Sequence, residues 1–147
     1  MDQGIRYKVL VSVSSRIDYI DVVEELAANL GQAVGFTEEV FEIKLAVREA
    51  VANAVLHGNK AQAGKLVHLE FLMEDEGLAV RIRDEGPGFR IEEIPDPTRA
   101  ENLLKPTGRG VLLIRNLMDE VDFSRTAEAG GEVVMVKRRS PAEAAGS

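Results

Sequence analysis

The stretch that decides the fold reads Glu49-Ala50-Val51-Ala52-Asn53-Ala54-Val55-Leu56-His57-Gly58-Asn59. It predicts the second half of a helix that begins after an N-cap at Thr37 and runs to about Leu56. Apolar side chains cover most of this helix and leave one polar stripe: Glu42, Glu49, Asn53 and His57. A helix this apolar is largely buried, so its polar stripe must face water, a partner or a cavity.

The stripe has two interpretations. Glu49, Asn53 and His57 follow one another at intervals of four residues and therefore stack along one line of the helix. The first interpretation is a solvated helix edge, because Glu-x-x-x-Asn is common by chance. The second is a ligand site into which a carboxylate and a carboxamide point.

The rest of the chain predicts an α+β fold. Alternating apolar residues predict strands over 7–13, 67–73 and 78–82, and helical spacing predicts a helix over about 16–34, closed by Gly31 and Gly35. A proline-rich stretch over 85–107 has weak periodicity, which is typical of a functional lid or of a partly disordered segment. A helix from about 108 to 118 and a hairpin of 121–124 with 133–136 follow. This order favours one mostly antiparallel sheet with helices layered on one face.

A turn after the third predicted strand is the second candidate site. Asp84 follows Leu78, Val80 and Ile82 with a period of two, so it shares their inward face. A buried carboxylate needs a hydrogen-bond donor. An adenine amine and a backbone N–H of the following turn are equally good candidates. Gly86 and Gly88 allow a ligand to approach the backbone closely.

A glycine pair opens the last predicted helix, in Thr107-Gly108-Arg109-Gly110. Free N–H groups at a helix N-terminus bind phosphate, and Arg109 adds a cation. A lid hinge explains the same glycines equally well. The Gly-x-x-x-x-Gly-Lys-[Ser/Thr] motif is absent from the sequence, which excludes a P-loop.

Composition limits the function classes. The 147 residues fit one domain, predicted over 1–139 with a frayed tail at 140–147. The absence of cysteine excludes thiol catalysis and cysteine zinc sites. A net charge of −7 without a basic cluster argues against direct nucleic-acid binding and fits protein partners. No apolar run approaches the ~20 residues that span a bilayer, and no secretory h-region opens the chain, so we expect a cytoplasmic protein without membrane contact.

The order of these motifs resembles the N, G1 and G2 boxes of the GHKL ATPases, whose members include gyrase, Hsp90 and histidine kinases. The resemblance covers roughly residues 5–138. Within that superfamily, residues 49–59, 110–114 and 117–121 look like those of the anti-sigma-factor serine/threonine kinases. The resemblance implies a two-layer α/β sandwich of the GHKL (Bergerat) type, with a mixed, mostly antiparallel sheet, helices on one face and an ATP lid.

The resemblance also implies a function. It implies a kinase that uses ATP and Mg²⁺ to phosphorylate a small anti-sigma-factor antagonist, binds a sigma factor in a partner-switching system, and often forms a homodimer. Glu49 would be the general base and Asn53 would bind Mg²⁺, while Asp84 would receive the adenine amine. The implied nucleotide contacts are Asn53, Asp84, Gly86, Gly88, Phe89, Thr107, Gly108, Arg109, Gly110 and Val111.

The chain departs from the family pattern in two places. Glu132 follows the turn Ala129-Gly130-Gly131, near a position where relatives often have a Thr that supports the adenine-contacting Asp. Pro106 stands where some relatives place a basic residue, so Lys105 or Arg109 would contact the terminal phosphate. His57 could face the phosphates, although a structural histidine near a helix end is the stronger interpretation.

Three other functions remain open from the sequence. One is a non-catalytic, nucleotide-sensing binding module. Another is an orphan ATPase half of a histidine kinase, and the last is a structural domain without an occupied site. Retention of both Glu49 and Asn53 favours the kinase, because a pure binder needs no general base.

Overall fold

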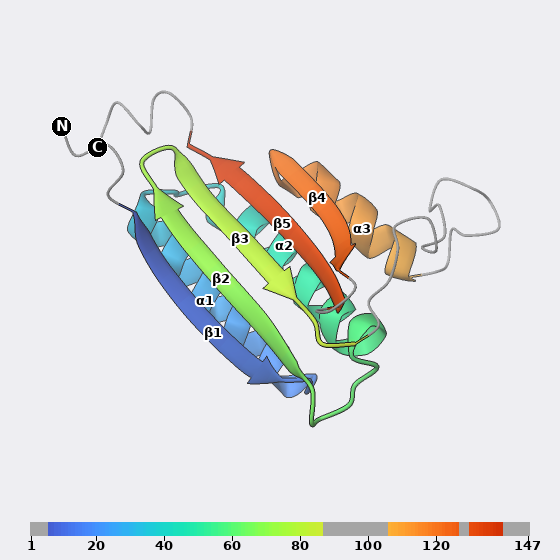
Figure 1. Ribbon diagram of the computed structural model, residues 1–147. Helices are drawn as coiled ribbons and strands as arrows, with labels where there is room; N and C mark the ends of the chain where they lie inside the picture. The colour runs from blue at the N-terminus through green and yellow to red at the C-terminus, as the bar shows by residue number, and fades with distance from the viewer. Residues whose placement is uncertain (1–5, 87–105, 127–129, 140–147) are drawn as a thin grey trace.

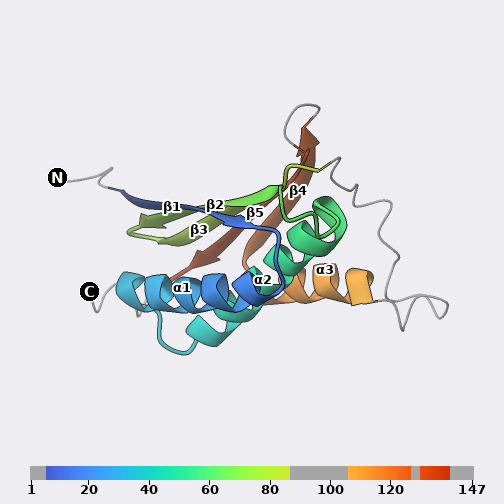
Figure 2. The same ribbon diagram turned by 90° about the horizontal axis from the view of Figure 1, so that it is seen from below.

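The computed structural model describes residues 6–86, 106–126 and 130–139, which fold into two layers. One layer is an antiparallel sheet of five strands in the order β1-β2-β3-β5-β4. The helices α1, α2 and α3 form the other layer and cover one face of the sheet (Figures 1 and 2). The predicted α+β architecture with helices on a single face is therefore confirmed.

The strands follow the period-two patterns of the sequence. They are β1 (Tyr7–Ser14), β2 (Leu66–Glu74), β3 (Gly77–Arg83), β4 (Glu120–Thr126) and β5 (Gly130–Arg138). Their register aligns apolar residues into rows on the inner face, one of which is Val9, Phe71, Val80, Met135 and Val121. Such rows form the sheet side of the core, because alternate residues of a strand share one face.

The first helix, α1 (Asp18–Val34), packs against α2 and the sheet. Gly35 ends it in the left-handed conformation with φ of 110°, which glycine adopts without steric cost. Gly31, also expected to close the helix, lies inside α1 instead. A Cβ on Gly31 would be 3.4 Å from Ile43 Cδ1, an ordinary van der Waals distance, so this glycine lies at the contact between α1 and α2.

The second helix, α2 (Val40–Asn53), is shorter than predicted at both ends. Glu39 is its N-cap residue, so the assignment of Thr37 as the N-cap is wrong. Thr37 belongs to a preceding turn, in which the Val40 N–H bonds to the Thr37 carbonyl oxygen over 3.3 Å. At the other end the α-helix stops at Asn53 and continues as one π-helical turn, η1 (Ala54–Gly58).

The third helix, α3 (Pro106–Leu117), lies beside α2. Lys137 of β5, only 8% exposed, donates a hydrogen bond of 2.7 Å to the Leu117 carbonyl oxygen at the end of α3. Its Nζ also lies 3.2 Å from a carboxylate oxygen of Glu42. Glu42, the first member of the polar stripe, thus pairs with the lysine that binds the C-terminal end of α3. No helix within the described ranges is long and apolar enough to cross a membrane.

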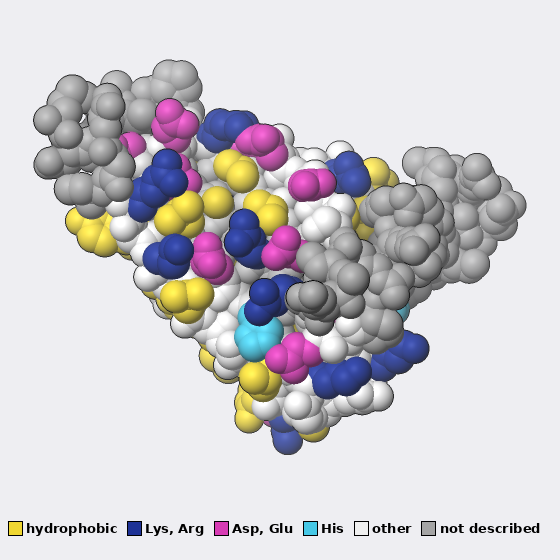
Figure 3. Space-filling model, viewed as in Figure 1, with side chains coloured by type: hydrophobic (Ala, Val, Ile, Leu, Met, Phe, Trp, Pro, Cys, Tyr) yellow, Lys and Arg dark blue, Asp and Glu magenta, His cyan; other side chains and the backbone are white. Residues whose placement is uncertain are grey.

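The opposite face of the sheet is uncovered by described helices (Figures 2 and 3). Acidic, basic and apolar side chains intermingle there. Oppositely charged residues of neighbouring strands pair across it, as Lys8 does with Glu70 at 3.8 Å and Arg81 with Glu132 at 3.6 Å. The charges on this face are therefore arranged as mixed cross-strand pairs.

Candidate functional site

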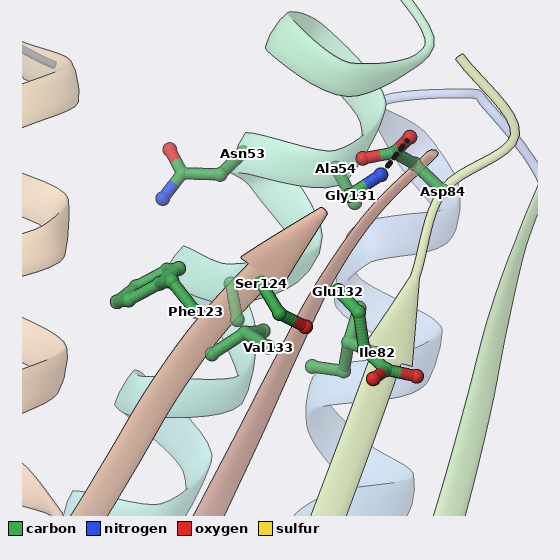
Figure 4. A pocket seen from close by; sticks show the side chains of 10 residues that line it. Asn53, Ala54, Ile82, Asp84, Phe123, Ser124, Gly131, Glu132 and Val133 are labelled. Atoms are coloured by element: carbon green, nitrogen blue, oxygen red, sulfur yellow. Dashed lines mark hydrogen bonds between the residues drawn. The ribbon is translucent and has the colours of Figure 1, made fainter. Parts of the chain in front are cut away.

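A recess lies between α2 and the ends of β3, β5 and β4, where the polar residues of the sequence motifs meet (Figure 4). Its free volume is about 10 Å³, roughly the space of one water molecule, so the recess is narrow as it stands. The lining residues come from three places in the sequence: Ala50, Asn53 and Ala54; Ile82 and Asp84; Phe123, Ser124, Gly131, Glu132 and Val133. The walls are mostly apolar with a few polar groups, which is typical of a ligand site.

Asp84 lines this recess directly after β3 and is only 1% exposed. Its Oδ1 accepts hydrogen bonds of 3.0 Å from the backbone N–H groups of Gly86 and Gly131 (Figure 4 draws the second). The predicted inward position is confirmed, and so is the bond from the following turn. A carboxylate has room for about four hydrogen bonds, so these two do not exclude a ligand amine.

Three glycines let the backbone close around Asp84. A Cβ on Gly58 would lie 2.1 Å from Asp84 Oδ2, and one on Gly130 would lie 2.5 Å from Asp84 Oδ1. A Cβ on Gly86 would lie 1.7 Å from the Gly58 carbonyl oxygen. Any side chain at these positions would push the three segments apart. Gly86 was predicted, whereas Gly58 and Gly130 were quoted only as parts of a motif and a turn.

The polar stripe of α2 meets the first turns of α3. A Cβ on Gly110 would lie 3.0 Å from Glu49 Oε2 and 3.7 Å from both amide atoms of Asn53. Asn53 is 6% exposed, and its Nδ2 has no hydrogen-bond partner among the described residues. Asn53 is therefore not part of a solvated edge, whereas Glu49 beside it is half-buried. It brings a carboxylate and a buried carboxamide to the glycine-rich start of α3.

The remaining predicted contacts divide into three groups. Thr107, Gly108 and Arg109 belong by their backbone to the first turn of α3, and Val111 follows them as a buried side chain, 6% exposed. His57 is exposed on η1, because the π turn takes it off the line of Glu49 and Asn53. Gly88, Phe89 and Lys105 lie outside the described residues, so their predicted roles stay predictions.

Glu132 does not place a second carboxylate beside Asp84. It alternates along β5 with the buried Gly131 and Val133, so its side chain belongs to the other face of the sheet, where it pairs with Arg81. The N–H of Gly131 is the group from this strand that supports Asp84. Local sequence pattern could not reveal this, because it depends on the pairing of β3 with β5.

Comparison with known proteins agrees with this geometry. Residues 13–137 match the family of histidine kinase-like ATPase domains. An anti-sigma F factor of Oceanobacillus iheyensis is 35% identical over 105 residues, which cover 70% of this chain and 72% of the relative. Anti-sigma F factors of Bacillus cereus and Bacillus thuringiensis are each 34% identical over 123 residues, covering 81% of this chain and 83% of the relative. The chain therefore belongs to the histidine kinase-like (GHKL) ATPase family, in which it groups with the anti-sigma F factors.

Proposed function

We propose that the chain is an anti-sigma factor with protein serine/threonine kinase activity. In this proposal it binds ATP and Mg²⁺ in the recess and phosphorylates a small antagonist protein. It also binds a sigma factor, in keeping with the names of its relatives, which are anti-sigma F factors. The observation that carries the catalytic part is the meeting of Glu49, Asn53 and Gly110, because it joins a base, a metal-binding oxygen and a phosphate-binding helix start.

The chemistry of the recess fits both ligands. A buried amide nitrogen without a partner costs about 1–3 kcal/mol, so the unpaired Asn53 Nδ2 favours a bound acceptor such as a phosphate oxygen. The Oδ1 of the same side chain is a hard oxygen ligand of the kind that Mg²⁺ takes, usually together with substrate phosphates. Asp84 is a buried acceptor for the base amine. When bound, Mg-ATP supplies the phosphoryl group and neutralises its charge.

Glu49 is the residue to which we assign the general base. Its carboxylate lies one helical turn before Asn53 and beside Gly110, at the half-exposed edge of the site. A partner's hydroxyl could therefore reach it from solvent while the nucleotide is held more deeply. Glu49 would hold that hydroxyl in place and accept its proton. The backbone of α3 would orient the phosphates by its free N–H groups.

The test is phosphoryl transfer by wild type, Glu49→Gln and the matched control Glu42→Gln, with each anti-sigma-factor antagonist of the source genome and labelled ATP. We expect Glu49→Gln to lose transfer by about a hundredfold or more, as for removal of a general base, while ATP affinity by calorimetry changes little. Glu42→Gln should retain transfer, because Glu42 pairs with Lys137 at the far end of α3.

Other outcomes lead to the other functions. ATP binding without transfer to any antagonist would make the chain a nucleotide-sensing binding module. A transferred phosphate lost in acid would indicate phosphohistidine and a histidine-kinase-like domain. Absence of ATP binding by the wild type would contradict the proposal. The implied homodimer is tested separately by light scattering on the purified protein.

A further inference from the structure

Asn59 is a fully buried polar residue at the end of η1, with an exposed fraction of 0%. Its Oδ1 accepts a hydrogen bond of 2.7 Å from the Glu85 backbone N–H. Its Nδ2 donates to Ser15 Oγ at 2.8 Å and to the Leu66 carbonyl oxygen at 2.9 Å. The carboxamide thus joins the chain after α2 to β1, β2 and the turn after β3.

The bond to Glu85 is the one that reaches the recess. Glu85 stands between Asp84 and Gly86, so fixing its N–H fixes the peptide that carries the buried carboxylate. The same turn is held from its other side by the Glu85 carboxylate, which accepts bonds from the Leu66 N–H at 2.8 Å and from His68 Nε2 at 2.6 Å. Asn59 itself is not among the residues that line the recess.

Asn59 also sets where Gly58 lies. The Asn59 N–H bonds to the Ala54 carbonyl oxygen at 2.8 Å, which closes the π turn. This closure holds Gly58 against Asp84 Oδ2, at a distance that leaves no room for a Cβ. Asn59 therefore constrains the Asp84 carboxylate in two ways: through the Glu85 N–H and through the position of Gly58.

We propose that Asn59 is a positioning residue for base recognition: through the Glu85 N–H it fixes the Asp84 carboxylate, and so sets a preference for purines that carry an exocyclic amine. The inference rests on the proposed binding of ATP in the recess. It concerns the base end of the site alone. The phosphate end, at Asn53 and Gly110, is where α2 meets α3.

The preference is measured by comparing ATP with inosine triphosphate, in which a carbonyl oxygen replaces the amine. The Kd of both nucleotides is determined by calorimetry for wild type and Asn59→Ala. We expect Asn59→Ala to weaken ATP binding by about tenfold, which corresponds to one lost hydrogen bond, and inosine triphosphate binding by less than about twofold. A merely structural role for Asn59 would weaken both nucleotides equally.

Ser15→Ala is the matched control. It removes another buried partner of the Asn59 carboxamide but leaves the bond to Glu85 in place. We expect it to lower the thermal midpoint while preserving the ratio of the two affinities. If Asn59→Ala does not fold, Asn59→Ser is measured instead, because its shorter hydroxyl cannot reach the Glu85 N–H.

Each outcome separates this inference from the proposed function. If a folded Asn59 variant has the same ratio of Kd values for ATP and inosine triphosphate as the wild type, the positioning role is overturned and ATP binding is left intact. Equal affinity of the wild type for both nucleotides overturns amine recognition, again with ATP binding intact. A wild type that binds neither nucleotide contradicts the proposed function and this inference together.

Discussion

Gly58 packs directly against the Asp84 carboxylate, and this contact leads to a prediction about one methyl group. The Cβ of Gly58→Ala would lie 2.1 Å from Asp84 Oδ2, well inside van der Waals contact. Because Asp84 is buried and held by two backbone N–H groups, it has little freedom to give way. We expect a loss of stability on the order of 1–3 kcal/mol, as for other overpacked sites, and at least a tenfold loss of ATP affinity.

Gly64→Ala is the control for this change. Gly64 lies in the exposed loop before β2, and a Cβ there would meet nothing within 4 Å. It should leave both urea unfolding and ATP calorimetry close to wild type. A Gly58→Ala protein that binds ATP as well as Gly64→Ala would contradict the role of Asp84 in base binding.

The π turn η1 and the residues after it form the element that connects α2 to the site. Lys60 and Ala61 follow with φ of 53° and 56°, in the left-handed region, and neither is glycine. The Ala61 N–H bonds to the Val55 carbonyl oxygen at 2.7 Å, which ties this strained segment back to the turn. Left-handed conformation costs a non-glycine residue about 1–2 kcal/mol. This segment thus adopts an unfavourable backbone conformation directly after Gly58 and Asn59, and its hydrogen bond to Val55 keeps those two residues in place.

Ala61→Gly should therefore raise the free energy of unfolding by about 1 kcal/mol, whereas an Ala→Gly substitution usually lowers it. Urea unfolding monitored by circular dichroism measures it. Ala63→Gly, in the same exposed loop but without a positive φ, should lower stability by about 0.5 kcal/mol through the entropy of the unfolded chain. Equal effects of the two substitutions would show that the left-handed residue carries no strain.

The stability of the folded molecule should fall in acid partly through Glu85. The Leu66 N–H and the His68 side chain hold the pKa of the Glu85 carboxyl below its usual value near 4.5. A carboxyl whose pKa is lowered by folding stabilises the folded state above its unfolded pKa, and this contribution disappears as the pH falls through the folded pKa. We expect Glu85→Gln to be less stable than wild type at pH 7, and the difference to shrink as the pH falls below the usual value near 4.5 and to be lost only below the lowered pKa of the folded state.

Urea titrations at pH 7, 5 and 4 test this expectation. Glu38→Gln removes the same charge from an exposed carboxylate in the turn before α2, and serves as the control. Its stability difference from wild type should vary less with pH than that of Glu85→Gln. A constant difference for Glu85→Gln across this range would contradict the coupling of the Glu85 bonds to folding.

The sequence by itself determined the architecture, and it suggested most of the residues of the candidate site. Within the described residues, period-two and helical spacings identified the five strands and three α-helices, although not the π turn η1, because each amphipathic pattern can bury its apolar side in only one kind of element. The inward position of Asp84 followed from the same periodicity. The ordered motifs also identified the superfamily and the anti-sigma-factor group, which the matching family and relatives confirm.

The tertiary structure decided where these pieces meet. The end of α2 at Asn53 and the π turn after it depend on how Gly58 packs against Asp84, and no local propensity encodes that contact. The support of Asp84 by Gly131 requires β5 to pair with β3, across 47 residues of chain. The hydrogen bonds of the Asn59 side chain likewise join four segments that are separated in the sequence. Local pattern fixes which face of an element is buried, whereas the partner of a buried polar group is fixed only when distant segments pack together.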